Sequence, residues 1–259
     1  MRKDYQLEKY IRFEHNGKSG YGRLEGKKVR VLNGPYWQDH TETEKSIALD
    51  EIKLLCPVQP TKIVCVGLNY RKHVQHSQSA TEVPKTPVLF MKPPSALLEP
   101  GGEIVYPDNC DRVDYEAELG VVIGRRGRKI PAEKVFDHIF GYSCLNDVTA
   151  RHIQKGDGQW TRGKGFDTFC PVGPHVVTGI DPKSLQVEAY LNGEQKQSGN
   201  TSEMIFPVPE LISFISSVMT LEPGDIIATG TPEGIDPMQI GDEVEIRIEK
   251  IGSLFNKIV

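Results

Sequence analysis

Short apolar runs, separated by turns rich in glycine and proline, recur along most of the chain. Beyond residue 62 they predict strands at 63–66, 88–91, 118–123, 139–145, 187–191, 226–229 and 244–248. Helical periodicity is sparse and is found near 69–79, 149–155 and 209–219. Because strands dominate without a regular β-α-β alternation, the pattern predicts an α+β, β-rich fold. We expect a mixed sheet roll or sandwich with few short helices.

The first 56 residues carry their own hairpin signals. Apolar runs are interrupted by turn pairs at Asn16-Gly17, Glu25-Gly26 and Asn33-Gly34. A first clear boundary follows at Pro57 and Pro60. The sequence therefore predicts a small β-rich N-terminal domain at 1–56 and a larger domain at 57–259.

Composition excludes several classes of protein. The 259 residues have a net charge of -4 and no basic run, which argues against a nucleic-acid partner. No apolar stretch approaches the roughly 20 residues that span a bilayer, and no apolar segment follows the N-terminus as in a signal peptide. The five cysteines are odd in number and widely spaced, which argues against disulfides. We expect a cytoplasmic protein without a membrane partner.

The segment 113–124 contains two acidic residues in an unusual place. Its odd positions form an unbroken apolar face, so Glu116 and Glu118 share the other face, with Cα atoms roughly 6.5–7 Å apart. Two carboxylates that close repel unless a cation lies between them. An edge strand with a solvated acidic face is the alternative. The run Val121–Ile123 is apolar on both faces and indicates a strand entering the core, which favours a metal ion.

Asp147 is a third candidate metal ligand. It follows an apolar strand and precedes a short helical pattern, and Arg151 and Gln154 come four and seven residues later. This spacing predicts that the three side chains share one helical face. The alternative is an N-capping aspartate with a surface ion pair.

A short polar helix near residue 69 contains a candidate general base. Asn69, His73 and His76 are spaced at i, i+4 and i+7, and an imidazole titrates near neutral pH. A histidine facing solvent is the more common reason for such a pattern, so the spacing alone leaves both interpretations open.

Two glycine-containing loops complete the candidate site. Lys164 lies between glycines, where an ammonium group can approach an anionic substrate. The turn at 229–234 follows a strand and offers backbone N–H groups, such as that of Gly230, and hydroxyls, such as that of Thr231, to a carboxylate or oxyanion. Ordinary turn chemistry is the alternative for both loops. Residues 158–165 nearly match a phosphate-binding loop but lack its final hydroxyl residue, so we reject nucleotide binding.

Four motifs, taken in order, resemble those of the fumarylacetoacetate hydrolase family. They are DYEAEL at 114–119, NDVTAR at 146–151, GKGFDT at 163–168 and TGTPEG at 229–234. The resemblance runs from about residue 62 to the C-terminus and implies the family's C-terminal-like fold, a homodimer, and a site for Mg²⁺ or Mn²⁺, with Ca²⁺ also suitable.

The resemblance also implies roles for particular residues. Glu116, Glu118 and Asp147 would be the metal ligands, His73 the catalytic base, and Lys164 the group that stabilises an enolate or oxyanion. The side chains expected to hold the substrate are those of Arg151, Gln154 and Thr231.

One position departs from the family pattern. Shorter members often have a glutamate three residues after the catalytic histidine, where it helps to activate water, and this chain has His76 there. An imidazole cannot orient His73 as a carboxylate would, although Glu82 or Glu233 is a candidate substitute.

Three functions follow. The first is metal-dependent hydrolytic C–C cleavage of an acylpyruvate, a 2,4-diketo acid, through an enolate. The second uses the same enolate chemistry without water, as an isomerase, tautomerase, decarboxylase or lyase of a keto diacid. The diacid would be of the 2-hydroxyhepta-2,4-diene-1,7-dioate or oxaloacetate type. The third, a metal-stabilised binding module, is disfavoured because His73, Lys164 and Arg151 accompany the three acids.

Overall fold

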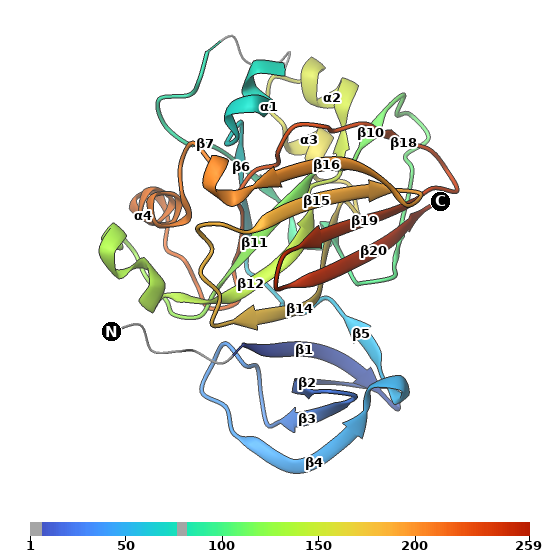
Figure 1. Ribbon diagram of the computed structural model, residues 1–259, viewed down its shortest axis with the longest axis vertical. Coiled ribbons are helices and arrows are strands. Elements are labelled where there is room, and N and C mark those ends of the chain that lie inside the picture. The colour runs from blue at the N-terminus through green and yellow to red at the C-terminus, as the bar shows by residue number, and fades with distance from the viewer. Residues whose placement is uncertain (1–6, 77–81) are drawn as a thin grey trace.

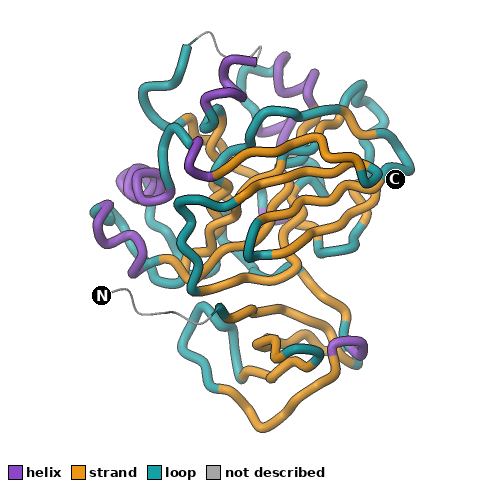
Figure 2. Tube along the Cα trace, viewed as in Figure 1, coloured by secondary structure: helices purple, strands orange, loops and turns teal. Residues whose placement is uncertain are grey.

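The computed structural model describes residues 7–76 and 82–259, except for the side chains of residues 73, 75 and 76. Strands make up most of its regular structure, and they form a large sheet, a smaller sheet in front of it and a short ribbon (Figure 1; Figure 2). The expected β-rich α+β class with few short helices is confirmed. Within the described residues, no helix combines the length and the apolar character that a membrane span requires.

The large sheet runs from the N-terminal strands to the core of the molecule. Along the sheet its strands are β4 (Glu42–Ala48), β3 (Lys28–Leu32), β2 (Lys18–Glu25), β1 (Glu8–His15), β14 (Cys170–Thr178), β12 (Ile139–Asn146), β11 (Ala117–Ile123), β17 (Ile226–Ala228), β6 (Ile63–Gly67) and β7 (Val88–Lys92). Two short strands join from the side, β5 (Lys53–Leu55) on β1 and β8 (Leu97–Leu98) on β14. The pairs β17–β6 and β14–β8 are parallel, and the other pairs of this sheet are antiparallel.

Two smaller sheets pack near the middle of the large one. The five-stranded sheet has the order β16 (Glu194–Asn200), β15 (Gln186–Leu191), β19 (Glu243–Ile248), β20 (Gly252–Ile258) and β9 (Glu103–Ile104). The short ribbon has the order β13 (Thr149–Ala150), β10 (Val113–Asp114) and β18 (Pro237–Met238). In Figure 1 the five-stranded sheet lies in front of β11 and β12.

The helices are short and lie outside the sheets. They are α1 (Arg71–His76), α2 (Arg151–Gly156), α3 (Thr161–Lys164) and α4 (Val208–Val218), with 3-10 turns η1 (Leu49–Glu51), η2 (Pro94–Ala96), η3 (Ala132–Asp137) and η4 (Thr201–Glu203). Helix α4 buries Leu211, Ile212 and Ile215, which are spaced to form one apolar stripe. Helices α1, α2 and α3 gather at the end of the molecule opposite β1–β4 (Figure 1).

Strand β11 is the central element of the core. All its residues are buried, because β12 and β17 flank it in the sheet and the five-stranded sheet covers one of its faces. This explains why Val121–Ile123 is apolar on both sides, as expected for a strand enclosed by other layers. The side chains of Glu116, which directly precedes β11, and of Glu118 within it are therefore buried in the protein interior rather than at a solvated edge.

The N-terminal strands form a meander whose turns follow the predicted signals. The β1–β2 hairpin turns at Asn16-Gly17, both with positive φ, as a type I′ turn requires. The Asn192-Gly193 pair makes the equivalent turn between β15 and β16. Strand β1 also pairs with β14, so the meander continues the large sheet. The division into domains at 1–56 and 57–259 stays a prediction.

Three local expectations are wrong in detail. The strand predicted through Glu116 is broken, because β10 ends at Asp114 and β11 begins at Ala117. Asp147 does not share a helical face with Arg151, since β13 comes between Asp147 and α2, and the N-cap of α2 is Ala150. Lys164 is the last residue of α3 rather than part of a loop.

Candidate functional site

A cavity of about 290 Å³ opens at the end of the molecule where α2 and α3 lie. Its walls come from the ends of β6 and β7, the start of β11, the residues after β12, helices α2 and α3, and the turn after β17. The lining residues are Val66, Gly67, Leu68, Phe90, Arg112, Glu116, Glu118, Asp147, Arg151, Gln154, Lys155, Trp160, Lys164, Thr231, Glu233, Gly234 and Ile235. Every predicted site residue except His73 and Gly230 is among them.

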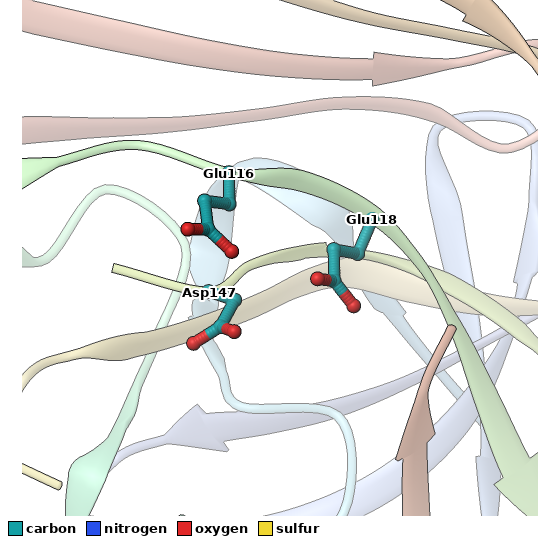
Figure 3. Close-up of side chains that lie close together, drawn as sticks. All are labelled: Glu116, Glu118 and Asp147. Atoms are coloured by element: carbon teal, nitrogen blue, oxygen red, sulfur yellow. The ribbon is translucent and has the colours of Figure 1, made fainter. Parts of the chain in front are cut away.

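Three carboxylates converge in this cavity. Glu116 and Glu118 extend from one side of the β10–β11 segment, and Asp147 approaches from the residue after β12 (Figure 3). One oxygen atom from each lies within 4.8 Å of the others, and all three side chains are buried. The Asp147 N–H donates to the carbonyl of Glu116, so pairing of β11 with β12 fixes the approach of the third acid.

Glu118 is the least compensated of the three acids. Burial raises the pKa of this carboxyl well above its ordinary value, and the carboxylates of Asp147 and Glu116 raise it further. Its Oε2 atom accepts the N–H of Gly230 at 2.8 Å. A buried acid in this position needs either a proton or a cation to become stable, and a divalent ion satisfies all three carboxylates at once.

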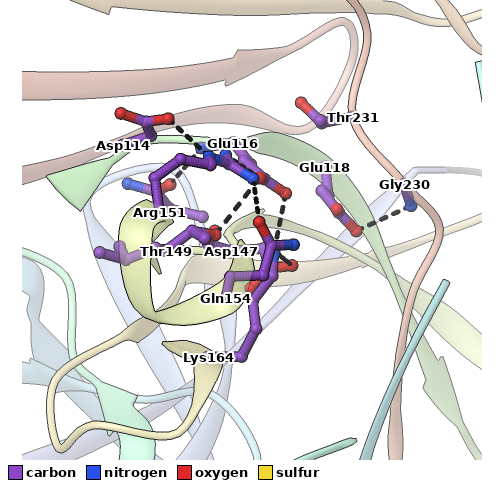
Figure 4. Close-up of polar contacts among 12 residues, drawn as sticks. Asp114, Glu116, Glu118, Asp147, Thr149, Arg151, Gln154, Lys164, Gly230 and Thr231 are labelled. Carbon is purple, nitrogen blue, oxygen red and sulfur yellow. Dashed lines mark hydrogen bonds and ion pairs between the residues drawn. The ribbon is translucent and has the colours of Figure 1, made fainter. Parts of the chain in front are cut away.

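Lys164 projects from the end of α3 toward the acids. Its ammonium nitrogen donates to Glu116 Oε2 at 2.9 Å and to Asp147 Oδ2 at 2.5 Å (Figure 4). Burial lowers the pKa of this ammonium group, but Asp147 and Glu116 outweigh burial, and the pKa lies above its ordinary value. The site thus contains a protonated lysine beside the oxygen atoms that would hold a metal ion.

The donor set fits a divalent metal ion. Asp147 Oδ1 is buried and accepts no hydrogen bond from the residues that the structure describes. It lies 2.8 Å from Lys92 Nζ, but that ammonium group directs its protons to the carbonyls of Val148, Lys164 and Phe169. An unused carboxylate lone pair within an all-oxygen cluster suits Mg²⁺, Mn²⁺ or Ca²⁺.

Arg151 and Gln154 lie in the cavity wall and bind each other. Arg151 donates through Nε to Asp114, through one terminal nitrogen to Gln154 Oε1 and through the other to Glu116 Oε1. Each guanidinium nitrogen therefore already has a protein acceptor. Arg151 orients the metal-ligand candidate Glu116 in this arrangement, and its predicted contact with substrate stays a prediction.

The turn after β17 reaches the cavity through Thr231. Its hydroxyl accepts the amide of the buried Gln197 at 2.8 Å, and Gln197 also accepts the N–H of Ala117 at the start of β11. Gly230 has a positive φ, and a Cβ atom there would lie 2.7 Å from that of Asn69. The Gly230 N–H donates to Glu118, and the predicted contact of Gly230 with substrate stays a prediction.

The predicted base lies at the border of what is described. His73 is in helix α1, but its side chain, like that of His76, lies outside the described residues. The neighbouring Asn69 is fully buried and joins three segments, because its side chain binds the backbone of Phe206 and of Thr229. Asn69 therefore anchors the start of α1, and the role of His73 stays a prediction.

Sequence reasoning missed four residues of this site. Lys92 lies beside Asp147 and donates a hydrogen bond to the carbonyl of Lys164. Arg112 lines the cavity, as do Phe90 and Trp160, whose rings pack edge to face with centroids 5.2 Å apart. A lysine at the end of the apolar strand β7 was a signal for Lys92, since lysines are rarely buried without a partner. Arg112 and the aromatic pair carried no such signal, because they come from separate segments.

Two known family models together match almost the whole chain. Residues 62–259 match the family model "Fumarylacetoacetate (FAA) hydrolase C-terminal", and residues 8–57 match "Rv2993c-like, N-terminal". The oxaloacetate tautomerase YisK of Bacillus subtilis is 44% identical over 82% of this chain and 74% of its own length.

Solved structures agree with this similarity. The crystal structure of 2-hydroxyhepta-2,4-diene-1,7-dioate isomerase from Mycobacterium marinum has a TM-score of 0.90 and 40% identity, covering 97% of this chain and 98% of its own. The maleylpyruvate hydrolase from Sphingobium sp. SYK-6, in complex with manganese(II) ion and pyruvate, has a TM-score of 0.79 and 29% identity, with 97% and 98% covered. With its family model matched over 198 residues (62–259) and the motifs gathered at one cavity, the chain belongs to the fumarylacetoacetate hydrolase family.

Proposed function

We propose that the protein is a divalent-metal-dependent isomerase that interconverts the keto and enol forms of a 2-keto diacid of the oxaloacetate type. The observation that carries the proposal is the meeting of three buried carboxylates and one buried lysine in a single cavity. The similarity to an oxaloacetate tautomerase and to a dienedioate isomerase supports this reaction over hydrolysis.

Each side chain has a chemical task in such a reaction. A divalent ion held by Glu116, Glu118 and Asp147 would polarise the keto oxygen and stabilise negative charge that develops on it. Lys164 is protonated and lies beside the carboxylate of Glu116, close to where the substrate would bind the ion. Its ammonium group is therefore suited to stabilise an enolate by hydrogen bonding. Phe90 and Trp160 form an apolar part of the wall and reduce the access of water.

Enolisation also needs a group that removes a proton from carbon. His73 stays our proposed base, with a pKa that in a free imidazole lies near neutrality. Enolisation requires no activated water, so the histidine at position 76 is compatible with it. Hydrolysis of an acylpyruvate stays the second prediction, supported by the similarity to a maleylpyruvate hydrolase, and it requires another group to orient His73.

The decisive experiment follows the ultraviolet absorbance of enol-oxaloacetate after mixing with the protein. We expect faster loss of the enol band with Mg²⁺ or Mn²⁺ than in buffer and metal alone, and no acceleration after chelation. The product should remain four-carbon oxaloacetate, measured by reduction with malate dehydrogenase. The Lys164→Met variant should lose most of the acceleration, and Arg126→Met, altered at an exposed surface pair, should keep it.

Acetylpyruvate is the substrate that tests the competing reaction, hydrolysis. Metal-dependent loss of its absorbance with release of acetate and pyruvate, together with no effect on enol-oxaloacetate, would replace the proposed reaction by hydrolysis. Loss of oxaloacetate itself with formation of pyruvate would identify a decarboxylase.

We also propose that the protein acts as a homodimer in the cytoplasm. The homodimer rests on the family resemblance, and the cytoplasmic location rests on the odd number and wide spacing of the cysteines. Sedimentation equilibrium tests the dimer, since the chain has a mass of 28.9 kDa and a dimer would have twice that mass.

A further inference from the structure

One buried carboxylate holds two arginines beside the cavity. Asp114 is fully buried, and its two oxygen atoms accept different guanidinium groups. Arg112 Nε donates to Oδ1 at 2.7 Å, and Arg151 Nε donates to Oδ2 at 2.8 Å. Both arginines line the cavity. In both arginines the bond to Asp114 is made through Nε, and neither terminal nitrogen donates a hydrogen bond to Asp114.

The two arginines differ in what their terminal nitrogens do. Those of Arg151 bind Gln154 and Glu116, and the side chain is 10% exposed. Those of Arg112 make no hydrogen bond or ion pair to any residue in the described part of the chain, and its side chain is 44% exposed. Arg112 is thus held in place by one bond and keeps a planar pair of donors, a shape that matches a carboxylate.

The charges of the cavity wall suggest a substrate with two negative charges. Four cations line it, Arg112, Arg151, Lys155 and Lys164, and they balance four carboxylates, Glu116, Glu118, Asp147 and Glu233. Behind the wall lie one further buried cation, Lys92, and one further buried carboxylate, Asp114. A divalent ion would therefore leave the site with an excess of positive charge, which a dicarboxylate would reduce.

We propose that Arg112 binds the distal carboxylate of the substrate and thereby selects dicarboxylic over monocarboxylic 2-keto acids. The inference deepens the proposed function and rests on it. The 2-keto acid end of the substrate would lie at the three carboxylates and Lys164, in the buried part of the cavity. The distal carboxylate would lie at the more exposed part, where Arg112 supplies the donors.

The test compares two substrates that differ only in the distal charge: oxaloacetate and its 4-methyl ester, both followed by enol absorbance. We expect Arg112→Met to raise KM for oxaloacetate by about 10- to 100-fold, the effect of losing one charge-assisted contact. The values of kcat for oxaloacetate and of KM for the ester should stay close to wild type. Arg112→Lys should restore part of the affinity, and Arg126→Met should change neither substrate.

A binding measurement separates this inference from the proposed function. Calorimetric titration of the Mn²⁺-loaded protein would use oxalate, which has only the chelating end, and 3,3-difluoro-oxaloacetate, which has the distal carboxylate but cannot enolise. Arg112→Met should weaken the second ligand and leave oxalate unchanged. This result would support Arg112 as the diacid contact even if the wild-type protein failed to interconvert enol-oxaloacetate.

Two results would overturn the inference. Equal weakening of oxaloacetate and the ester, or of both calorimetric ligands, by Arg112→Met would mean that Arg112 only maintains the shape of the site through Asp114. No weakening of either diacid would mean that the distal carboxylate binds elsewhere. Thermal unfolding with chelator establishes that Arg112→Met, Arg112→Lys and Arg126→Met are each folded.

Discussion

At one end of the molecule, the N-terminal region packs Tyr10 and Tyr36 against Phe140, and the ring centroids of Tyr36 and Trp37 lie 4.9 Å apart. At the opposite end of the molecule, the start of β11 and the end of β12 bring carboxylates into the interior, beside a buried lysine. The first region has charged groups paired at its surface, such as Lys53 with Glu99.

The two regions therefore rest on different energetics. Burying aromatic rings stabilises the fold directly, and exposed ion pairs add little because solvent screens them. Burying several charges costs stability unless each is paired, and breaking one buried pair leaves its partner uncompensated. Substitutions at the cavity end should thus affect metal binding and catalysis strongly, and substitutions in the meander should affect folding alone.

The largest effect is expected from Glu118→Gln. Loss of one of three ligands should lower Mn²⁺ affinity by at least about 100-fold, and catalysis should fall with it. With chelator present, the variant should instead be more stable than wild type at pH 8. The raised pKa of Glu118 means that the folded protein resists an ionisation that the unfolded chain allows. Calorimetric Mn²⁺ titration and thermal unfolding with EDTA measure the two effects.

Glu42→Gln is the matched control, because Glu42 is a surface carboxylate of the meander paired with Arg23. It should leave Mn²⁺ binding unchanged. Unaltered Mn²⁺ affinity in Glu118→Gln would remove Glu118 from the ligand set.

Next in size is the contrast between two lysines. Lys92→Met should lower the free energy of unfolding by about 3–5 kcal/mol, because three buried carbonyls and Asp147 lose their cation. Lys53→Met removes an exposed pair and should cost less than about 1 kcal/mol. Urea unfolding measures both, and equal losses would contradict the proposed difference between the two ends.

Trp37→Ala tests the meander. Trp37 is buried against Tyr21 and Tyr36, and its truncation should cost about 3 kcal/mol of unfolding free energy. Mn²⁺ affinity should not change. Phe136→Ala, at a ring that is 47% exposed, should stay within about 0.5 kcal/mol of wild type. A fall in Mn²⁺ affinity for Trp37→Ala would show that the two regions are coupled.

The smallest effect concerns pH. Burial lowers the pKa of His175 to about 4, and its Nε2 lies 2.7 Å from the carbonyl of Ile251. The unfolded chain takes up a proton near pH 6.5 and the folded protein does not. This contribution to stability is present above pH 6.5 and is lost as pH falls toward 4. It should cost about 2 kcal/mol at pH 5, using 1.36 kcal/mol per pKa unit.

His175→Gln should remove this part of the pH dependence, measured by urea unfolding between pH 5 and pH 8. His15→Gln, near the tip of the β1–β2 hairpin, is the control and should retain it. An unchanged slope in His175→Gln would mean that His175 takes up its proton in the folded protein.

Much of the fold was predictable because its strands are short and well punctuated. The expected strand at 63–66 is Ile63–Gly67 in the structure, and the expected helix at 209–219 is Val208–Val218. The β-rich class and the family resemblance were also confirmed. These features depend on local periodicity and on motif order, which a single sequence displays.

The site was predictable only as far as its motifs reach. Glu116, Glu118 and Asp147 were brought together by motif order, but the break before Ala117 and the strand β13 after Asp147 were not foreseen. Lys92 was missed because its contacts are with residues distant in the sequence, and Arg112 was missed because the cavity that it lines is built from distant segments. Asp114 was visible in a motif, but nothing in the sequence showed that it binds two arginines.

The ammonium group of Lys92 joins the carbonyls of Val148, Lys164 and Phe169, residues that bracket helices α2 and α3. These hydrogen bonds hold the two ends of the segment between Val148 and Phe169 together. The two ends cannot separate without exposing the buried charge of Lys92. Arg151 and Lys164 would therefore move together when this segment unfolds locally. Their backbone amides should exchange with deuterium as one cooperative unit.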